Sequence, residues 1–99
     1  MEFLVAFEVE VPAGTPAGEV EGHERAESAA AAKLAEDGHL VRLWRRPLVG
    51  DGTTAIGLYR ADSRAELDGL LATLPLALWL HVTVTPLAAH PNDPATASR

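Results

Sequence analysis

Hydrophobic and polar positions alternate along residues 2–11, EFLVAFEVEV. One set of alternate side chains is wholly apolar, while the other mixes glutamates with Leu and Ala; the apolar set is Phe3, Val5, Phe7, Val9 and Val11. A period of two predicts a β-strand with one buried face. The PAGTPAG segment that follows contains two prolines and two glycines, which predicts a loop.

Residues 19–37, EVEGHERAESAAAAKLAED, have the composition of a helix. The AAAAKLAE run has high helix propensity, and Gly38 suits the position just after the helix end. A spacing of three and four residues gives this helix an inward seam, which consists of Val20, His23, Glu27, Ala30 and Leu34. A slightly rotated helix would instead place Glu24 and Glu27 in water and turn alanines inward. An alanine-rich helix allows both arrangements.

The second half of the chain predicts four more elements. Residues 39–46, HLVRLWRR, and 53–60, TTAIGLYR, predict antiparallel strands joined by a turn with Asp51-Gly52 at its tip. Ser63 and Glu66 form a capping box that begins a second helix, whose buried stripe is Leu67, Leu70, Leu71 and Leu74. Residues 78–85, LWLHVTVT, alternate again and predict a fourth strand.

The resulting order, β-α-β-β-α-β, is that of the ferredoxin-like α+β fold, with a four-stranded antiparallel sheet and two helices on one face. No further element covers the other face, and an uncovered apolar sheet face is best satisfied by a second copy of the chain. We therefore expect a homodimer built sheet on sheet. We also expect a single domain over residues 1–94 and a flexible tail over residues 95–99, because the end of the chain is rich in proline, alanine and serine.

Composition and charge exclude several classes of function. The 99 residues suffice for one domain, and the absence of cysteine excludes disulfides and thiolate metal sites. A net charge of -6 argues against nucleic-acid binding, which draws most of its affinity from basic residues. The chain starts without the basic segment of a signal peptide and has no apolar run near the roughly 18–20 residues that cross a membrane. We therefore expect a cytoplasmic protein without a membrane partner.

Several short motifs stand at fixed places along the predicted elements. They are RLWR at 42–45 after the first helix, LPL at 74–76 at the end of the second helix and HP at 90–91 after the last strand. Together with Pro12 after the first strand and the acid Glu27, they resemble the pattern of the muconolactone delta-isomerase family. The similarity covers residues 1–94.

The resemblance implies a bacterial, cofactor-free isomerase of aromatic catabolism, in the β-ketoadipate pathway, that converts muconolactone to the 3-oxoadipate enol-lactone. It also implies a dimeric α+β barrel that can assemble further, into decamers in some members. Family members carry His and Lys in the first strand where this chain has Leu4 and Ala6, and an acid early in the last strand where it has His81. We expect these three positions to face the pocket, so that the substitutions bear on the substrate.

The seam of the first helix carries the clearest candidate for chemistry. His23 and Glu27 are four residues apart, which makes their side chains neighbours on a helix. A carboxylate half-buried against the sheet suits a proton shuttle. The resemblance assigns Glu27 as general base and acid, with His23 as its modulator or partner.

The strand at 39–46 supplies candidate ligands for an anion. Its alternation puts Arg42 and Trp44 on one face and Arg45 on the other. An isomerase of an anionic lactone needs a cation for the substrate carboxylate, and arginine offers a bidentate contact. We expect Arg42 or Arg45 to anchor a small anionic substrate and Trp44 to contact it. The choice between the arginines stays open, as does the alternative that both pair with acids across the dimer.

Three more side chains are candidates for contact with the substrate. Tyr59 shares a face with Ala55 and Gly57, whose small size leaves room beside the ring. Trp79 suits the wall of a pocket or an interface. His81, expected on the same face of the last strand, is a candidate for a second acid–base group or for a surface contact. The four histidines have no metal-ligand spacing, and the chain has no nucleotide-binding motif, so we expect neither metal nor cofactor.

Two other functions are compatible with the same residues. The ferredoxin-like dimer also hosts cofactor-free monooxygenases, cyclases and decarboxylases, because a fold does not fix a function. A non-catalytic ligand-binding module is the other alternative, in which Glu27 is solvated and the arginines pair with acids.

Overall fold

The computed structural model of the chain describes residues 1–45 and 54–97. The strands and helices follow one another in the predicted order, with two short helical segments added: β1 (Glu2–Val9), α1 (Ala17–Glu36), β2 (Leu40–Arg45), β3 (Thr54–Arg60), α2 (Arg64–Ala72), the 3₁₀ turn η1 (Ala77–Trp79), β4 (Leu80–Leu87) and α3 (Pro94–Ala97). The predicted turn at 47–53 and the last residue of the predicted second strand, Arg46, lie outside the described residues.

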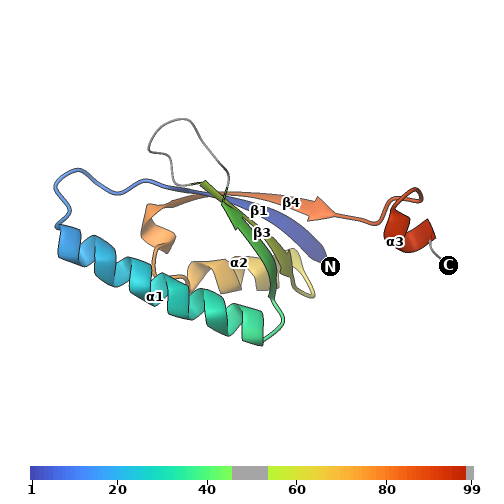
Figure 1. Ribbon diagram of the computed structural model, residues 1–99, viewed down its shortest axis with the longest axis horizontal. Coiled ribbons are helices and arrows are strands. Elements are labelled where there is room, and N and C mark those ends of the chain that lie inside the picture. Colours follow the sequence, from blue (N-terminus) through green and yellow to red (C-terminus); the bar gives the residue numbers. More distant parts are fainter. Residues whose placement is uncertain (46–53, 98–99) are drawn as a thin grey trace.

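The four strands form one antiparallel sheet in the order β2-β3-β1-β4. Figure 1 shows α1 and α2 side by side on the same face of this sheet, and no helix of the described residues on the other face. This confirms the predicted ferredoxin-like α+β architecture. The two faces are called below the helix face and the open face.

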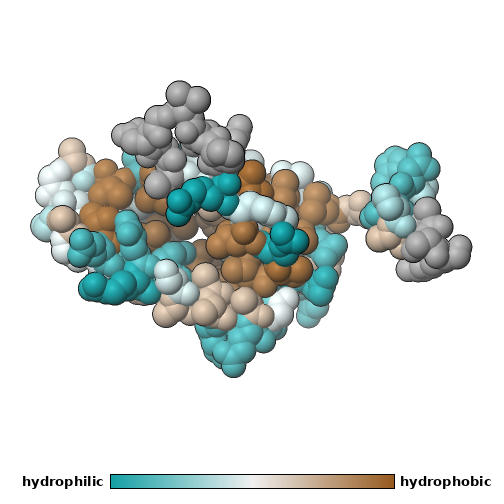
Figure 2. All heavy atoms as spheres, in the orientation of Figure 1, coloured by the Kyte–Doolittle hydropathy of each residue, from teal (hydrophilic) through white to brown (hydrophobic). Residues whose placement is uncertain are grey.

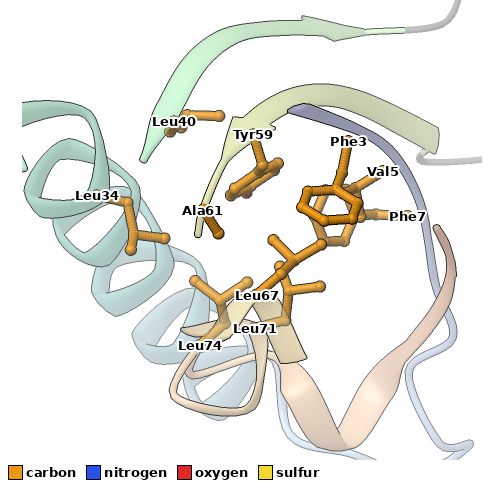
Figure 3. Close-up of a cluster of buried hydrophobic side chains, with 10 residues drawn as sticks. All are labelled: Phe3, Val5, Phe7, Leu34, Leu40, Tyr59, Ala61, Leu67, Leu71 and Leu74. Atoms are coloured by element: carbon orange, nitrogen blue, oxygen red, sulfur yellow. The ribbon is translucent and has the colours of Figure 1, made fainter. Parts of the chain in front are cut away.

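The core lies between the helix face of the sheet and the two helices. The alternation in β1 buries its predicted apolar side, and Phe3 and Val5 are almost completely shielded from solvent. Leu67 and Leu71 from α2 and Leu34 from α1 complete the cluster, which Figure 3 shows converging from both layers. Ser63 caps α2 as predicted, because its Oγ accepts a hydrogen bond of 3.0 Å from the Glu66 amide.

The last strand begins two residues later than the sequence predicted. After α2 the chain keeps turning, and the amides of Ala77 and Trp79 bond back to the carbonyls of Leu74 and Leu76 at 2.9 and 2.8 Å. These bonds make η1, so that Trp79 precedes β4 and is not part of its alternating faces. The prediction of a strand starting at residue 78 was therefore wrong at its first two positions.

The end of the chain stands away from the body of the protein. In Figures 1 and 2 the segment after β4, with α3, forms a separate small lobe beside the sheet and helices. The molecule measures 54 Å along its longest axis and 20 Å along its shortest. Within the described residues, none of the helices combines the length and the apolar character needed to cross a membrane.

Candidate active site

Glu27 lies on the face of α1 that packs against the sheet. The residues of the predicted seam are buried or half-buried, whereas Glu24 is exposed, so the structure selects the seam over the rotated alternative. The Glu27 Oε1 atom accepts a hydrogen bond of 3.0 Å from the backbone amide of Leu76. Its Oε2 atom has no hydrogen bond to any residue that the structure describes. One oxygen is thus held in place and the other is available.

A cavity of about 210 Å³ opens beside this carboxylate, between α1 and the sheet. Its walls come from all four strands, α1 and the segment after α2, and they are mainly apolar: Phe7, Val9, Glu27, Ser28, Ala31, Leu43, Ala55, Tyr59, Leu76 and Leu80. This volume suits a molecule with one small ring, since pockets for drug-sized ligands span roughly 300–1,000 Å³. Among the described residues, Glu27 is the one carboxylate in this lining.

Tyr59 reaches the same cavity from β3. Figure 3 shows its ring projecting from the strand toward the core cluster, and the residue is only 3% exposed. The ring fits because its neighbour is glycine: a Cβ on Gly57 would lie 2.6 Å from the Tyr59 Cε1 atom. Burial, and to a smaller extent the charge of Glu27, raise the pKa of Tyr59 to about 12. The phenol is therefore neutral near pH 7.

The strand register separates the two candidate arginines. Arg45 is paired with Ala55, which is paired with buried Phe7, so Arg45 lies in a row on the helix face. It borders a hollow of about 350 Å³ that shares four lining residues with the Glu27 cavity, namely Phe7, Val9, Leu43 and Ala55. The two spaces therefore adjoin, and the exposed Arg45 lines this outer hollow but not the Glu27 cavity.

Arg42 lies on the open face. It is paired with Leu58, which is paired with Leu4, and its guanidinium lies 5.1 Å from the centre of the Trp44 ring. The register of β2 shifts between Leu40 and Arg42, which puts these two residues on different faces although they are two apart. Trp44 is 41% exposed and borders the outer hollow but not the Glu27 cavity.

The predicted pairing of His23 with Glu27 does not form. The His23 ring contacts the Trp79 ring edge-on, with 4.6 Å between ring centres, and its Nε2 lies 3.9 Å from Glu19. The i,i+4 spacing does put His23 and Glu27 on one seam. Trp79 from η1, however, packs against His23, which lies one helical turn before Glu27. Neither His23 nor Trp79 lines the Glu27 cavity.

Leu4, Ala6 and His81 also lie away from the cavity. Their strand partners place them on the open face, and the His81 Nε2 atom lies 2.6 Å from Glu10 in an exposed pair. The expectation that these three positions face the pocket is therefore wrong for the Glu27 cavity. The reason is geometric, because the side chains that alternate with Phe3, Val5 and Phe7 must point to the opposite side of the sheet.

Two contributors to the site were not predicted as such. The Leu76 amide that holds Glu27 belongs to the LPL motif, which was noticed as a signature but not as a ligand. Leu43 forms part of the cavity wall, and its position next to Arg42 and Trp44 in the RLWR motif gave a local signal. Among the described residues, no group of three or more His, Cys, Asp or Glu side chains could hold a metal ion.

The fold and the site define a small α+β protein in which a carboxylate and a phenol line an apolar cavity and an arginine lines the hollow that adjoins it. The family model of muconolactone delta-isomerase matches residues 1–93. The chain is 36% identical over 96 residues to muconolactone delta-isomerase 1 of Acinetobacter lwoffii, covering 94% of each chain. It is 34% identical to muconolactone delta-isomerase of Cupriavidus pinatubonensis, covering 94% of this chain and 98% of the relative. The chain therefore belongs to the muconolactone delta-isomerase family and is an isomerase of aromatic catabolism.

Solved structures agree on the fold. A crystal structure of muconolactone isomerase matches with a TM-score of 0.82 at 24% identity over 95% of both chains. A 5-chloro-2-hydroxyhydroquinone dehydrochlorinase from Burkholderia phenoliruptrix matches with a TM-score of 0.63 at 16% identity, over 94% of this chain and 99% of that one. These likenesses show that the fold is shared by enzymes of different activity, so the reaction has to be argued from the site.

Proposed function

We propose that the protein moves a proton, and with it a double bond, within a small unsaturated lactone that carries a carboxylate. Muconolactone, converted to the 3-oxoadipate enol-lactone, is the substrate that the family assignment favours. The observation that carries the proposal is Glu27, half-buried at an apolar cavity of about 210 Å³ with one carboxylate oxygen held and the other free.

In the reaction, Glu27 acts first as base and then as acid. It removes the proton from the lactone carbon that bears the carboxymethyl group, and the electron pair of that C–H bond spreads over the ring to the carbonyl oxygen. Glu27 then returns the proton to the carbon next to the carbonyl, which leaves the double bond one position along the ring. The atoms balance, and no co-reactant is required. One carboxylate can serve both carbons if it can reach across the face of the ring.

The fixed position of Glu27 supports this role. Because the Leu76 amide holds Oε1, the carboxylate needs no reorientation before it takes the proton at Oε2. The apolar lining keeps the site poor in competing donors and strengthens electrostatic interactions within it.

Arg45 is the proposed anchor for the substrate carboxylate. It lies on the helix face, in the hollow that adjoins the cavity, where a carboxymethyl group on the ring would project. An arginine can bind a carboxylate through two parallel hydrogen bonds, which fixes the orientation of the ring as well as its place.

The test is the turnover of muconolactone by Glu27→Gln, followed by proton NMR. We expect a loss of about 10²-fold or more, because the amide cannot accept the proton. Glu24→Gln is the matched control, since Glu24 is exposed on the same helix, and it should keep normal turnover. Near-normal turnover in Glu27→Gln would exclude the assignment. Oxygen consumption with a quinol, in the absence of lactone turnover, would favour a monooxygenase instead.

We further propose that two copies of the chain pack their open faces together. The middle of that face carries the half-buried apolar side chains of Leu4, Ala6, Ile56 and Leu58, with Trp44 at the edge strand. Such a surface on a small domain is stabilised by a self-complementary partner.

A further inference from the structure

One polar group of the cavity has no part in the proton transfer described above: the hydroxyl of Tyr59. Its ring is fixed by packing. The Phe7 ring lies 5.9 Å away between centres at an angle of 58°, and the absence of a side chain on Gly57 leaves the space that the ring occupies. The ring is thus held without help from its hydroxyl.

The hydroxyl itself is open to the cavity. Within residues 1–45 and 54–97, no hydrogen bond joins Tyr59 Oη to another residue, and no side-chain polar atom there is both fully buried and unpaired. Tyr59 lines the cavity and is only 3% exposed, so a molecule in that space lies beside the ring and within reach of its hydroxyl. A hydroxyl so placed can donate a hydrogen bond to a molecule in the cavity.

Tyr59 and Glu27 reach the cavity from opposite walls. Glu27 comes from α1, and Tyr59 comes from β3 in the sheet below it. A flat ring between the two layers can therefore present a C–H bond to Glu27 and its carbonyl oxygen to Tyr59. The phenol keeps its proton at neutral pH, because burial and then the Glu27 charge raise its pKa to about 12.

We propose that Tyr59 is a second catalytic residue, whose hydroxyl donates a hydrogen bond to the lactone carbonyl oxygen as negative charge collects there. When Glu27 takes the ring proton, the electron pair moves toward that oxygen, and the Tyr59 O–H stabilises the charge without giving up its own proton. Return of the proton to carbon restores the neutral carbonyl. Preorganised donors of this kind are worth most when they point to where charge develops. This inference rests on the proposed function, from which it takes its substrate.

The first test compares Tyr59→Phe with Glu27→Gln on muconolactone. Tyr59→Phe should lower kcat on the order of 10²-fold, as loss of one oxyanion donor does, with KM changed less than about threefold. Its thermal midpoint should stay close to that of the wild type, because the deleted hydroxyl bonds no described residue. Unchanged kcat in Tyr59→Phe beside an inactive Glu27→Gln overturns the role of Tyr59 alone. Normal turnover in Glu27→Gln overturns the proposed function.

A second measurement does not depend on turnover. A hydroxyphenylacetate with a nitro group beside its hydroxyl is a phenolate in mildly alkaline buffer, and it combines a ring oxyanion with a carboxymethyl group. Binding is measured in the Glu27→Gln background, where the neutral amide stands for the protonated carboxyl. We expect Tyr59→Phe to weaken this binding at least about tenfold and to leave unsubstituted phenylacetate unaffected, because only the phenolate receives the charge-assisted hydrogen bond. Equal loss for both molecules, or no loss for either, contradicts the proposal.

Discussion

The polar side chains at the cavity, Glu27 and Tyr59, are half-buried and buried, whereas Arg42 and His81 on the open face are exposed. Glu27 and Tyr59 both line the apolar cavity between α1 and the helix face of the sheet. On the open face, Arg42 lies over Trp44 and His81 pairs with Glu10 at the surface. The same residue types therefore have different chemistry on the two sides, because an enclosed charge or dipole acts at a lower effective dielectric than an exposed one. This difference is the basis for proposing the reaction at the helix face and self-association through the open face.

The largest effect should come from a charge placed on the open face. Ile56→Glu puts a carboxylate among Leu4, Ala6 and Leu58 neighbours, and burying it against a second sheet without a partner costs several kcal/mol. We expect the variant to run as a single species near the 10.5 kDa of one chain, whereas the wild type runs at twice that mass or more. Size-exclusion chromatography with light scattering measures both.

Ala29→Glu is the control for this variant. Ala29 is exposed on α1, on the other side of the molecule from the open face, so the same added charge should leave the assembly intact. A wild type that is monomeric at micromolar concentration would contradict the sheet-on-sheet assignment directly. So would an Ile56→Glu protein that remains assembled.

The next largest effect separates the two arginines. Arg45→Met removes the cation beside the cavity, and we expect kcat/KM for muconolactone to fall about 10-fold to 100-fold, since a hydrogen bond to a charged group contributes about 1.5–3 kcal/mol. Arg42→Met removes an equal charge from the open face and should leave kcat/KM within about twofold. Steady-state kinetics of both variants provide the measurement. The reverse order of effects would move the substrate to the open face.

The sequence predicted the layers of this molecule well and the inner site only in part. The alternation of β1 and the leucine stripe of α2 predicted the ferredoxin-like sheet and its core, because both patterns are local and strictly periodic. These features need only the spacing of residues along one element. The alanine-rich sequence of α1 allowed both an inward seam with Glu27 and a slightly rotated helix, and the structure selects the seam.

The contacts that define the site depend on more than one element, and here prediction failed or stayed open. The choice between Arg42 and Arg45 required the register shift in β2, which no sequence pattern marked. The helix spacing predicted a contact between His23 and Glu27, but the His23 ring packs against Trp79 from η1 instead. The donor to Glu27 is a backbone amide, which every residue but proline possesses, so its identity depends on how the segment after α2 turns.

The smallest expected effect is a difference in alkaline stability between the wild type and Tyr59→Phe. The pKa of Tyr59 is raised in the folded protein, from 10.0 to about 12. Below about pH 10, the pKa of the phenol in the unfolded chain, both the folded and the unfolded state keep the proton, and the stability that the neutral phenol gives the folded state is fully present. As the pH rises from about 10 through about 12, the unfolded chain loses its proton first, so stability falls. Tyr59→Phe lacks the group, and its stability should fall less over this window.

Urea unfolding of the wild type and of Tyr59→Phe, at a near-neutral pH and at one between the two values, measures this difference. The chain contains a single tyrosine, so the ultraviolet absorbance of tyrosinate reports Tyr59 alone. A titration midpoint near 12 in the folded protein agrees with a phenol enclosed beside Glu27. A midpoint near 10 would show that the phenol titrates as it does in water. Tyr59 would then contradict the contrast between an enclosed helix face and an exposed open face.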